Sequence, residues 1–126
     1  MIIENVLWIA IAVYFEARNQ ELPGKEVVAY CVMNRAVKRK LSPKEVVRQK
    51  KQFSFYNARV IPPIKEGLAF IDCVQVAATC FIKHKLGYRA GSIDHYYDKS
   101  LESNPPRWAA TMKSLGRVGD FYIFRS

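Results

Sequence analysis

The sequence of 126 residues is long enough for one folded domain and short for two. Half of its residues are hydrophobic and 25% are charged, a balance that excludes intrinsically disordered and fibrous proteins. Its 20 Lys and Arg residues against 11 Asp and Glu residues give a net charge of +9 at pH 7. Such a charge favours a polyanionic partner, which could be nucleic acid, acidic lipid or an anionic cell wall.

The first half of the chain carries three helix signals. An apolar run without Gly or Pro predicts a mostly buried helix over residues 5–17. Asn-Gln-Glu-Leu-Pro-Gly at 19–24 interrupts it, and helical spacing of apolar residues resumes over 25–38. Ser-Pro-Lys-Glu at 42–45 is a capping box, so we expect a third helix that ends near residue 50.

The second half mixes helix and strand signals. Residues 52–63 show neither periodicity and are expected to form a loop, whereas 66–85 predict the longest helix. The aromatic segments 94–97 and 121–124 could pair as two short strands. Between them, Pro-Pro is expected to open a last helix over 105–115. The predicted fold class is mainly α, an α+β domain with a small β element near the C-terminus.

Cysteine usage and hydropathy bear on metals and membranes. Cys73 and Cys80 would lie about 10 Å apart on one helix, beyond disulfide reach, so we expect these thiols and that of Cys31 to be buried and reduced. The sequence has no Cys-x-x-Cys or His/Cys cluster, and we expect no metal or organic cofactor. The apolar stretch 7–15 is too short to cross a bilayer and lacks basic flanking residues, so we expect neither a signal peptide nor stable membrane insertion.

Glu16 stands out among the acidic residues. It follows an apolar helix and has Tyr14, Phe15 and Ala17 as neighbours. A carboxyl group among apolar side chains has a raised pKa and can donate a proton near neutral pH. The alternative is that Glu16 faces solvent and pairs with Arg18 or caps the helix. Three other carboxylates lack a comparable apolar neighbourhood, namely Glu21, Asp94 and Asp98.

Aromatic residues gather outside the predicted helices. Rings interleaved with amides and a histidine are typical of a sugar-binding cleft, although a small domain can also bury such rings in its core. The residues concerned are Phe53, Phe55, Tyr56, Tyr88, Tyr96 and Tyr97, with Gln52, Asn57 and His95 between them. Basic clusters at 38–40, 48–51 and 83–85 accompany no nucleic-acid-binding motif, and we interpret them as solvated helix ends.

Taken together, the motifs resemble the SleB-like cell-wall hydrolase family. In chain order they are Tyr14-x-Glu16-Ala17-Arg18, Gly24, Val28-Ala29, Asn34-Arg35, Gln52-Phe53-Ser54, Asp94-His95-Tyr96-Tyr97, Pro106-x-Trp108-Ala109 and Val118-Gly119. The resemblance extends from Tyr14 to Arg125. It implies a single lysozyme-like domain over residues 1–126 that cleaves the glycan strands of peptidoglycan in the manner of lytic transglycosylases.

The resemblance also implies roles for individual residues. The catalytic acid of the family falls on Glu16, the residue already chosen on physical grounds. The expected substrate-binding residues are Tyr14, Arg18, Gln52, Phe53, Ser54, His95, Tyr96 and Tyr97. The sequence departs from the family pattern where a second glutamate is usual, because Gln20 stands there and Glu21 is shifted by one position. Tyr97 and Phe121 stand where the family often has histidines.

Three functional hypotheses remain at this stage. The first is a lytic transglycosylase that uses Glu16 alone, and the second is a hydrolytic muramidase with a second carboxylate. The third is a basic nucleic-acid-binding module without catalysis. A small, basic, leaderless domain resembles a bacteriophage endolysin, made in the host cytoplasm and acting on the wall after release, although a host-encoded enzyme is an alternative. We expect a monomer that binds peptidoglycan glycan strands and no nucleic acid.

Overall fold

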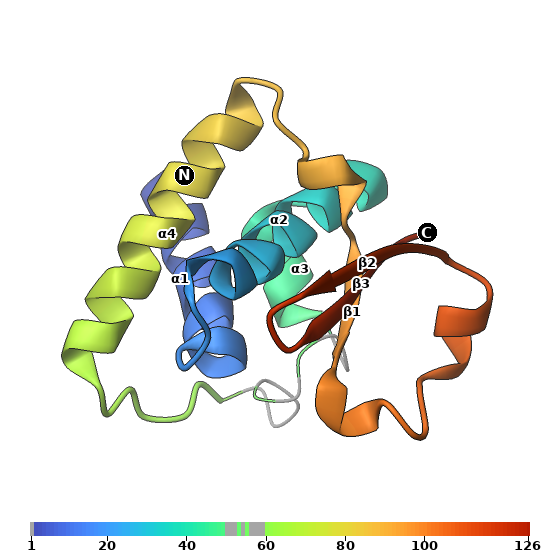
Figure 1. Ribbon diagram of the computed structural model, residues 1–126. Helices are drawn as coiled ribbons and strands as arrows, with labels where there is room; N and C mark the ends of the chain where they lie inside the picture. Colours follow the sequence, from blue (N-terminus) through green and yellow to red (C-terminus); the bar gives the residue numbers. More distant parts are fainter. Residues whose placement is uncertain (1, 50–52, 54, 56–59) are drawn as a thin grey trace.

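The computed structural model describes residues 2–49, 53, 55 and 60–126, which form a helical lobe and a small sheet (Figure 1). The helices are α1 (Ile2–Ala17), α2 (Leu22–Arg39), α3 (Pro43–Arg48) and α4 (Gly67–Lys85). The strands are β1 (His95–Asp98), β2 (Lys113–Val118) and β3 (Phe121–Arg125), and the 3-10 turns are η2 (Ala90–Ser92), η3 (Lys99–Leu101) and η4 (Arg107–Ala110). The α+β class is confirmed.

The four helices predicted between residues 5 and 85 are confirmed, with shifts at their ends. Helix α2 begins at Leu22 because Pro23 lies in its first turn, where the missing N–H of proline costs nothing. At the start of α3, the Glu45 N–H donates to Ser42 Oγ over 3.1 Å and the Ser42 N–H donates to Glu45 Oε1 over 3.0 Å. These two bonds are the capping box expected from the sequence.

The sheet is antiparallel, with β3 between β1 and β2. The predicted pairing of the two aromatic segments is confirmed by the register of Tyr96 opposite Ile123. The predicted helix over 105–115 is wrong, because only η4 is helical there and β2 follows. The last residues of that range, from Lys113, pair with β3, and a register shift follows at Gly116, whose φ is +103°. Pairing with β3 therefore overrides the local helix signal.

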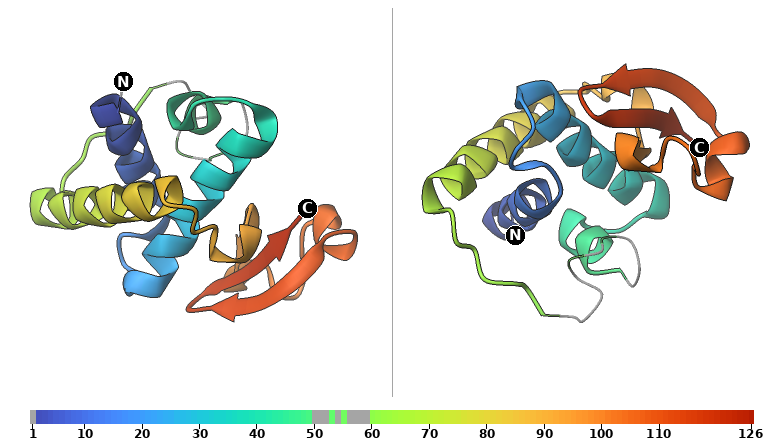
Figure 2. Two further views of the ribbon diagram at one scale, coloured as in Figure 1. Left: turned by 90° about the horizontal axis from the view of Figure 1, so that it is seen from above. Right: turned by 60° about the horizontal axis from the view of Figure 1, so that its bottom comes forward.

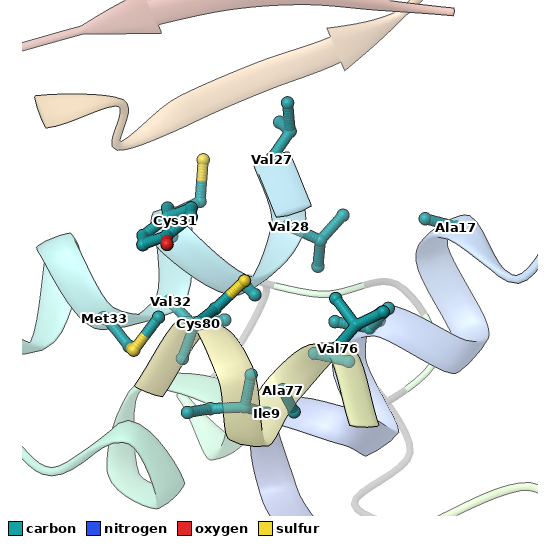
Figure 3. Packing of buried hydrophobic residues seen from close by; sticks show 14 of the residues in the cluster. Ile9, Ala17, Val27, Val28, Cys31, Val32, Met33, Val76, Ala77 and Cys80 are labelled. Atoms are coloured by element: carbon teal, nitrogen blue, oxygen red, sulfur yellow. The ribbon is translucent and has the colours of Figure 1, made fainter. Parts of the chain in front are cut away.

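Helix α2 lies between the other long helices and the sheet (Figure 2). Its apolar side chains pack with those of α1 and α4 in the core shown in Figure 3, and Val28, Val32 and Ile9 are fully buried. The predicted free thiols are confirmed, since Cys31, Cys73 and Cys80 are all buried and unpaired.

Helix α4 is, by length and composition alone, the one described helix that could cross a membrane; its most apolar window has a mean hydropathy of 1.2. The core helix of a folded domain has the same composition. In this structure Cys73, Ala77 and Cys80 of α4 are buried in the common core with α1 and α2.

A buried polar network joins α2, α4 and the segment that leads to β1. Asn34 Nδ2 donates to the carbonyls of Arg89 and Ile93, over 2.9 and 2.8 Å. Asn34 Oδ1 lies 3.0 Å from His84 Nε2, and since an amide oxygen only accepts, His84 must carry the proton on Nε2. Burial lowers the pKa of His84 to about 4, so the buried ring is neutral at neutral pH.

We predict that this histidine makes stability depend on pH. The pKa of His84 is about 4 in the folded state and should be about 6.5 in the unfolded chain. As pH falls through this interval, the unfolded state binds a proton that the folded state excludes, so the free energy of unfolding should decrease. His84→Gln keeps an N–H donor for Asn34 and should lose this part of the pH dependence, as measured by denaturant unfolding over the same pH range.

The matched control is His95→Gln, which removes the other histidine of the chain and leaves the His84 contribution in place. The pKa of His95 is also lowered by burial, so the two variants together account for both histidines. Equal pH dependence in wild type and His84→Gln would show that His84 is not held neutral.

Candidate active site

Glu16 lies in the last turn of α1 and meets β1. Tyr96 Oη donates a hydrogen bond to Glu16 Oε1 over 2.8 Å, which joins residues 80 positions apart in the sequence. The other carboxyl oxygen, Oε2, accepts no hydrogen bond from any residue that the structure describes. One oxygen of the carboxyl group is therefore held in place, and the second has no hydrogen-bond partner among the described residues.

Opposing effects determine the pKa of Glu16. Burial raises the pKa of Glu16, while the Tyr96 hydrogen bond and the positive charge of Arg35 oppose the rise. The same burial, together with the nearby Glu16 carboxyl, raises the pKa of Tyr96 well above its ordinary value. Tyr96 thus keeps its proton as a donor, and Glu16 holds its own proton to a higher pH than an exposed glutamate.

Arg18 does not pair with Glu16, the alternative left open by the sequence. Its Nε instead donates to Glu66 Oε2 over 2.5 Å, just before α4 begins, and its guanidinium lies 5.0 Å from the centroid of the Tyr14 ring. Tyr14 Oη accepts a hydrogen bond from the Glu66 N–H over 3.0 Å. Arg18 and Tyr14 together therefore hold the start of α4 against the end of α1.

Two of the aromatic residues predicted to bind substrate are buried. Tyr14 and Phe53 each expose only 2% of their surface. Tyr14 packs edge-on against Phe15 and Phe70, and Phe53 lies against Phe55. Their ring faces are covered by neighbouring side chains, so these two residues contribute packing beneath the site. Gln52 and Ser54, also predicted to bind substrate, lie outside the described residues.

The three consecutive aromatic residues of β1 do not share one face. Tyr96 points towards the helices, where its ring packs 4.8 Å from that of Phe121. His95 and Tyr97 point the other way, and their rings lie 5.0 and 6.1 Å from Trp108. All three are predicted from the sequence to bind substrate, and the alternation of side chains along a strand places Tyr96 on one face of β1 and His95 and Tyr97 on the other.

Two of the remaining candidate carboxylates, Asp94 and Asp98, are engaged elsewhere. Asp94 is 4% exposed and lies among polar partners: it accepts from Ser126 Oγ over 2.6 Å and lies 3.0 Å from His95 Nδ1. Although burial opposes the change, hydrogen bonds from Ser126 and His95 lower the pKa of Asp94. Asp98 Oδ2 accepts from the Ser100 N–H over 2.8 Å at the start of η3.

Gln20 has a role that the sequence did not reveal. Its Nε2 donates to Asp120 Oδ2 over 2.9 Å, which links the loop after α1 to the turn between β2 and β3. Gly119 in that turn has φ +55°, and a Cβ there would approach Gln20 Oε1 to 3.0 Å. The amide at position 20 thus joins the helical lobe to the sheet.

Glu16 lies neither in a group of metal-ligating side chains among the described residues nor in the pocket between α2 and the sheet. Among the residues that the structure describes, no group of three or more His, Cys, Asp or Glu side chains is placed to hold a metal ion. A pocket of about 400 Å³ lies between α2 and the sheet, lined in part by Val27, Tyr30 and Ile93, and its lining includes neither Glu16 nor Tyr96. The Glu16–Tyr96 pair is therefore the candidate site.

Comparisons with known proteins agree with this architecture. The catalytic domain of the germination-specific lytic transglycosylase SleB from Bacillus anthracis superimposes with a TM-score of 0.69 at 20% identity, covering 97% of this chain and 93% of that one. The catalytic domain of the Bacillus cereus SleB protein gives a TM-score of 0.63 at 19% identity, covering 97% and 89%. No protein of curated function matches the sequence.

At these identities the structural likeness shows a shared fold. Membership of a family is shown instead by the family model described as Cell Wall Hydrolase, which matches residues 19–124. The matched range begins three residues after Glu16, so the case for that residue depends on the geometry described above. With most of its length matched by that model, this chain belongs to the cell wall hydrolase family.

Proposed function

We propose that this protein cleaves the glycan strands of peptidoglycan between N-acetylmuramic acid and N-acetylglucosamine, as a lytic transglycosylase with Glu16 as its acid and base. The single observation that carries the proposal is the partly buried Glu16 carboxyl, held at Oε1 by Tyr96 while Oε2 has no hydrogen-bond partner among the described residues. Membership of the family and the fold shared with two SleB catalytic domains, one of them described as a lytic transglycosylase, support the choice of substrate.

The chemistry needs one carboxyl group in two protonation states. Protonated Glu16 gives its proton to the bridging oxygen as the bond from that oxygen to C1 of the muramic acid breaks. The resulting Glu16 carboxylate then accepts the proton of the C6 hydroxyl as that oxygen attacks C1, which closes a 1,6-anhydro ring. The carboxyl group ends the cycle protonated, and no water is consumed.

The surroundings of Glu16 favour this mechanism over hydrolysis. A hydrolase uses a second carboxylate to activate water or to form a covalent intermediate. The groups that act on the charge of Glu16 are instead a neutral phenol, Tyr96, and a cation, Arg35. Asp94 and Asp98 are occupied by the contacts described above, and position 20 carries an amide.

The first prediction of this proposal concerns the proton donor. Glu16→Gln is nearly isosteric and its amide oxygen can still accept from Tyr96, so the variant should fold normally. Without an acidic proton, lysis of purified peptidoglycan should fall by at least about 100-fold. Clearing of a peptidoglycan suspension and thermal unfolding measure the two properties. Glu21→Gln, a matched change in an exposed residue, should retain activity; a folded Glu16→Gln with near-normal lysis would refute the assignment.

A second prediction concerns pH dependence. Activity requires protonated Glu16 and should fall as pH rises through its pKa, which appears as the high-pH limb of kcat/KM. Tyr96→Phe removes a hydrogen bond that lowers the pKa of Glu16, so the high-pH limb should move to higher pH. Tyr97→Phe removes a hydroxyl from the opposite face of β1 and should leave the limb in place. The proposal fails here if both variants give the wild-type profile.

A third prediction concerns the reaction products. Mass spectrometry of digested peptidoglycan should show 1,6-anhydro muropeptides, each lighter by one water molecule than the hydrolytic product. Asp98→Asn should produce the same products at a similar rate, because Asp98 serves as the cap of η3. Muramic acid with a free reducing end as the main product would instead indicate a hydrolytic muramidase, and binding of nucleic acid without lysis would indicate a non-catalytic module.

A further inference from the structure

Arg35 is a buried cation beside the candidate site, and its contacts use only part of its guanidinium. The residue lies on α2 and exposes 7% of its surface. Its Nε donates to the Asp94 carbonyl over 2.6 Å, and the guanidinium lies 5.5 Å from the centroid of the Phe53 ring. Its Nη1 is buried and has no hydrogen-bond partner among the described residues. Leaving a buried charged donor unpaired is costly, so its retention calls for an explanation.

The positive charge of Arg35 has no ion-pair partner in the described structure. On its own helix it faces the buried thiol of Cys31, whose pKa is raised to about 12, and the cation Arg39. From the β1 side it contacts the Asp94 carbonyl and acts on the charges of His95 and Tyr96. From α1 it faces Glu16.

Of these groups only Asp94 and Glu16 can carry a negative charge near neutral pH. Asp94 already has Lys38 and His95 as partners, over 3.4 and 3.0 Å. Among the described residues, Glu16 has the neutral hydroxyl of Tyr96 as its hydrogen-bond partner. The ionised form of Glu16 is therefore the anion with which the unpaired charge of Arg35 can interact.

We propose that Arg35 is a positioning residue of the Glu16 site, which stabilises the Glu16 carboxylate and, through the Asp94 carbonyl, holds Tyr96 in place. This inference rests on the proposed role of Glu16 as acid and base. A nearby cation stabilises the neutral Glu16 carboxyl group only slightly, whereas it strongly stabilises the carboxylate formed on proton transfer. Arg35 thus favours the state that follows proton donation and keeps the carboxylate in place to accept the C6 hydroxyl proton.

The two parts of the role can be separated with two substitutions. Arg35→Gln removes the charge and keeps an N–H donor for the Asp94 carbonyl, whereas Arg35→Lys keeps the charge and loses the planar guanidinium. Lys38→Met is the matched control, since it removes a cation of the same helix that faces Asp94 rather than Glu16. The pKa of Glu16 is measured in the free proteins by carbon NMR of side-chain carboxyls, with the signal assigned by comparison with Glu16→Gln.

We expect the pKa of Glu16 to depend on the charge of the side chain at position 35. In Arg35→Gln the pKa of Glu16 should be higher than in wild type, and in Arg35→Lys and Lys38→Met it should match wild type. The high-pH limb of kcat/KM should move upward in Arg35→Gln alone, with kcat lower by about tenfold or more. An unchanged Glu16 pKa in folded Arg35→Gln overturns the inference. If Arg35→Gln does not fold, a raised Glu16 pKa in Arg35→Lys overturns it, because the charge is then still present.

The NMR readout does not depend on activity. If wild type fails to cleave peptidoglycan while the Glu16 pKa responds to Arg35→Gln as expected, the proposed function fails and the electrostatic link between Arg35 and Glu16 stands. If wild type is active and the Glu16 pKa ignores the charge at position 35, the proposed function stands and this inference fails.

Discussion

Two neighbouring polar side chains of α2, Asn34 and Arg35, hold the sheet against the helices. Asn34 binds the carbonyls of Arg89 and Ile93, and Arg35 binds that of Asp94, so three backbone acceptors just before β1 are satisfied by one turn of a helix. An unpaired buried acceptor costs about 1–3 kcal/mol. The Arg89 carbonyl also accepts from the Ser92 N–H over 2.9 Å, whereas Asn34 and Arg35 are the donors that the structure shows for the carbonyls of Ile93 and Asp94. The position of β1 depends on this contact.

The candidate site follows from that constraint. Once β1 is set against α2, the alternation of a strand sends Tyr96 towards the end of α1, where its hydroxyl meets Glu16. His95 and Tyr97 then belong to the outer face, where their rings pack with Trp108. The same buried arginine that anchors β1 also acts on the charge of Glu16. Fold stability and the chemistry of the carboxyl group thus share one residue.

A second contact between the lobes explains a departure from the family pattern. Gln20, where the family usually has a glutamate, donates from its amide to Asp120 in the β2–β3 turn. A glutamate there would place two carboxylates against each other, which is unfavourable unless one is protonated. In this chain the position serves to join the lobes, and the amide is the side chain of that length that can donate to Asp120.

The sequence by itself determined the features that depend on neighbouring residues. The capping box of α3, the apolar runs of α1 and α4, the free thiols and the place of Glu16 at a helix end are local patterns, and local hydrogen bonds and helical spacing produce them. The family motifs, too, could be recognised in order along the chain. The pairing of the two aromatic segments could also be predicted from the sequence, because aromatic residues favour strands.

Only the tertiary structure decided which side chains meet. The stretch 105–115 has helix signals, yet it forms only a 3-10 turn at Arg107–Ala110, and from Lys113 it pairs with β3 as a strand, since hydrogen bonds to a distant segment outweigh a weak local preference. Burial of Tyr14 and Phe53, and the separation of Tyr96 from its neighbours, depend on which elements pack above them. The effect of the Arg35 charge on Glu16 could not be predicted from the sequence. Electrostatic effects depend on distance in space and on burial, which the order of residues does not contain.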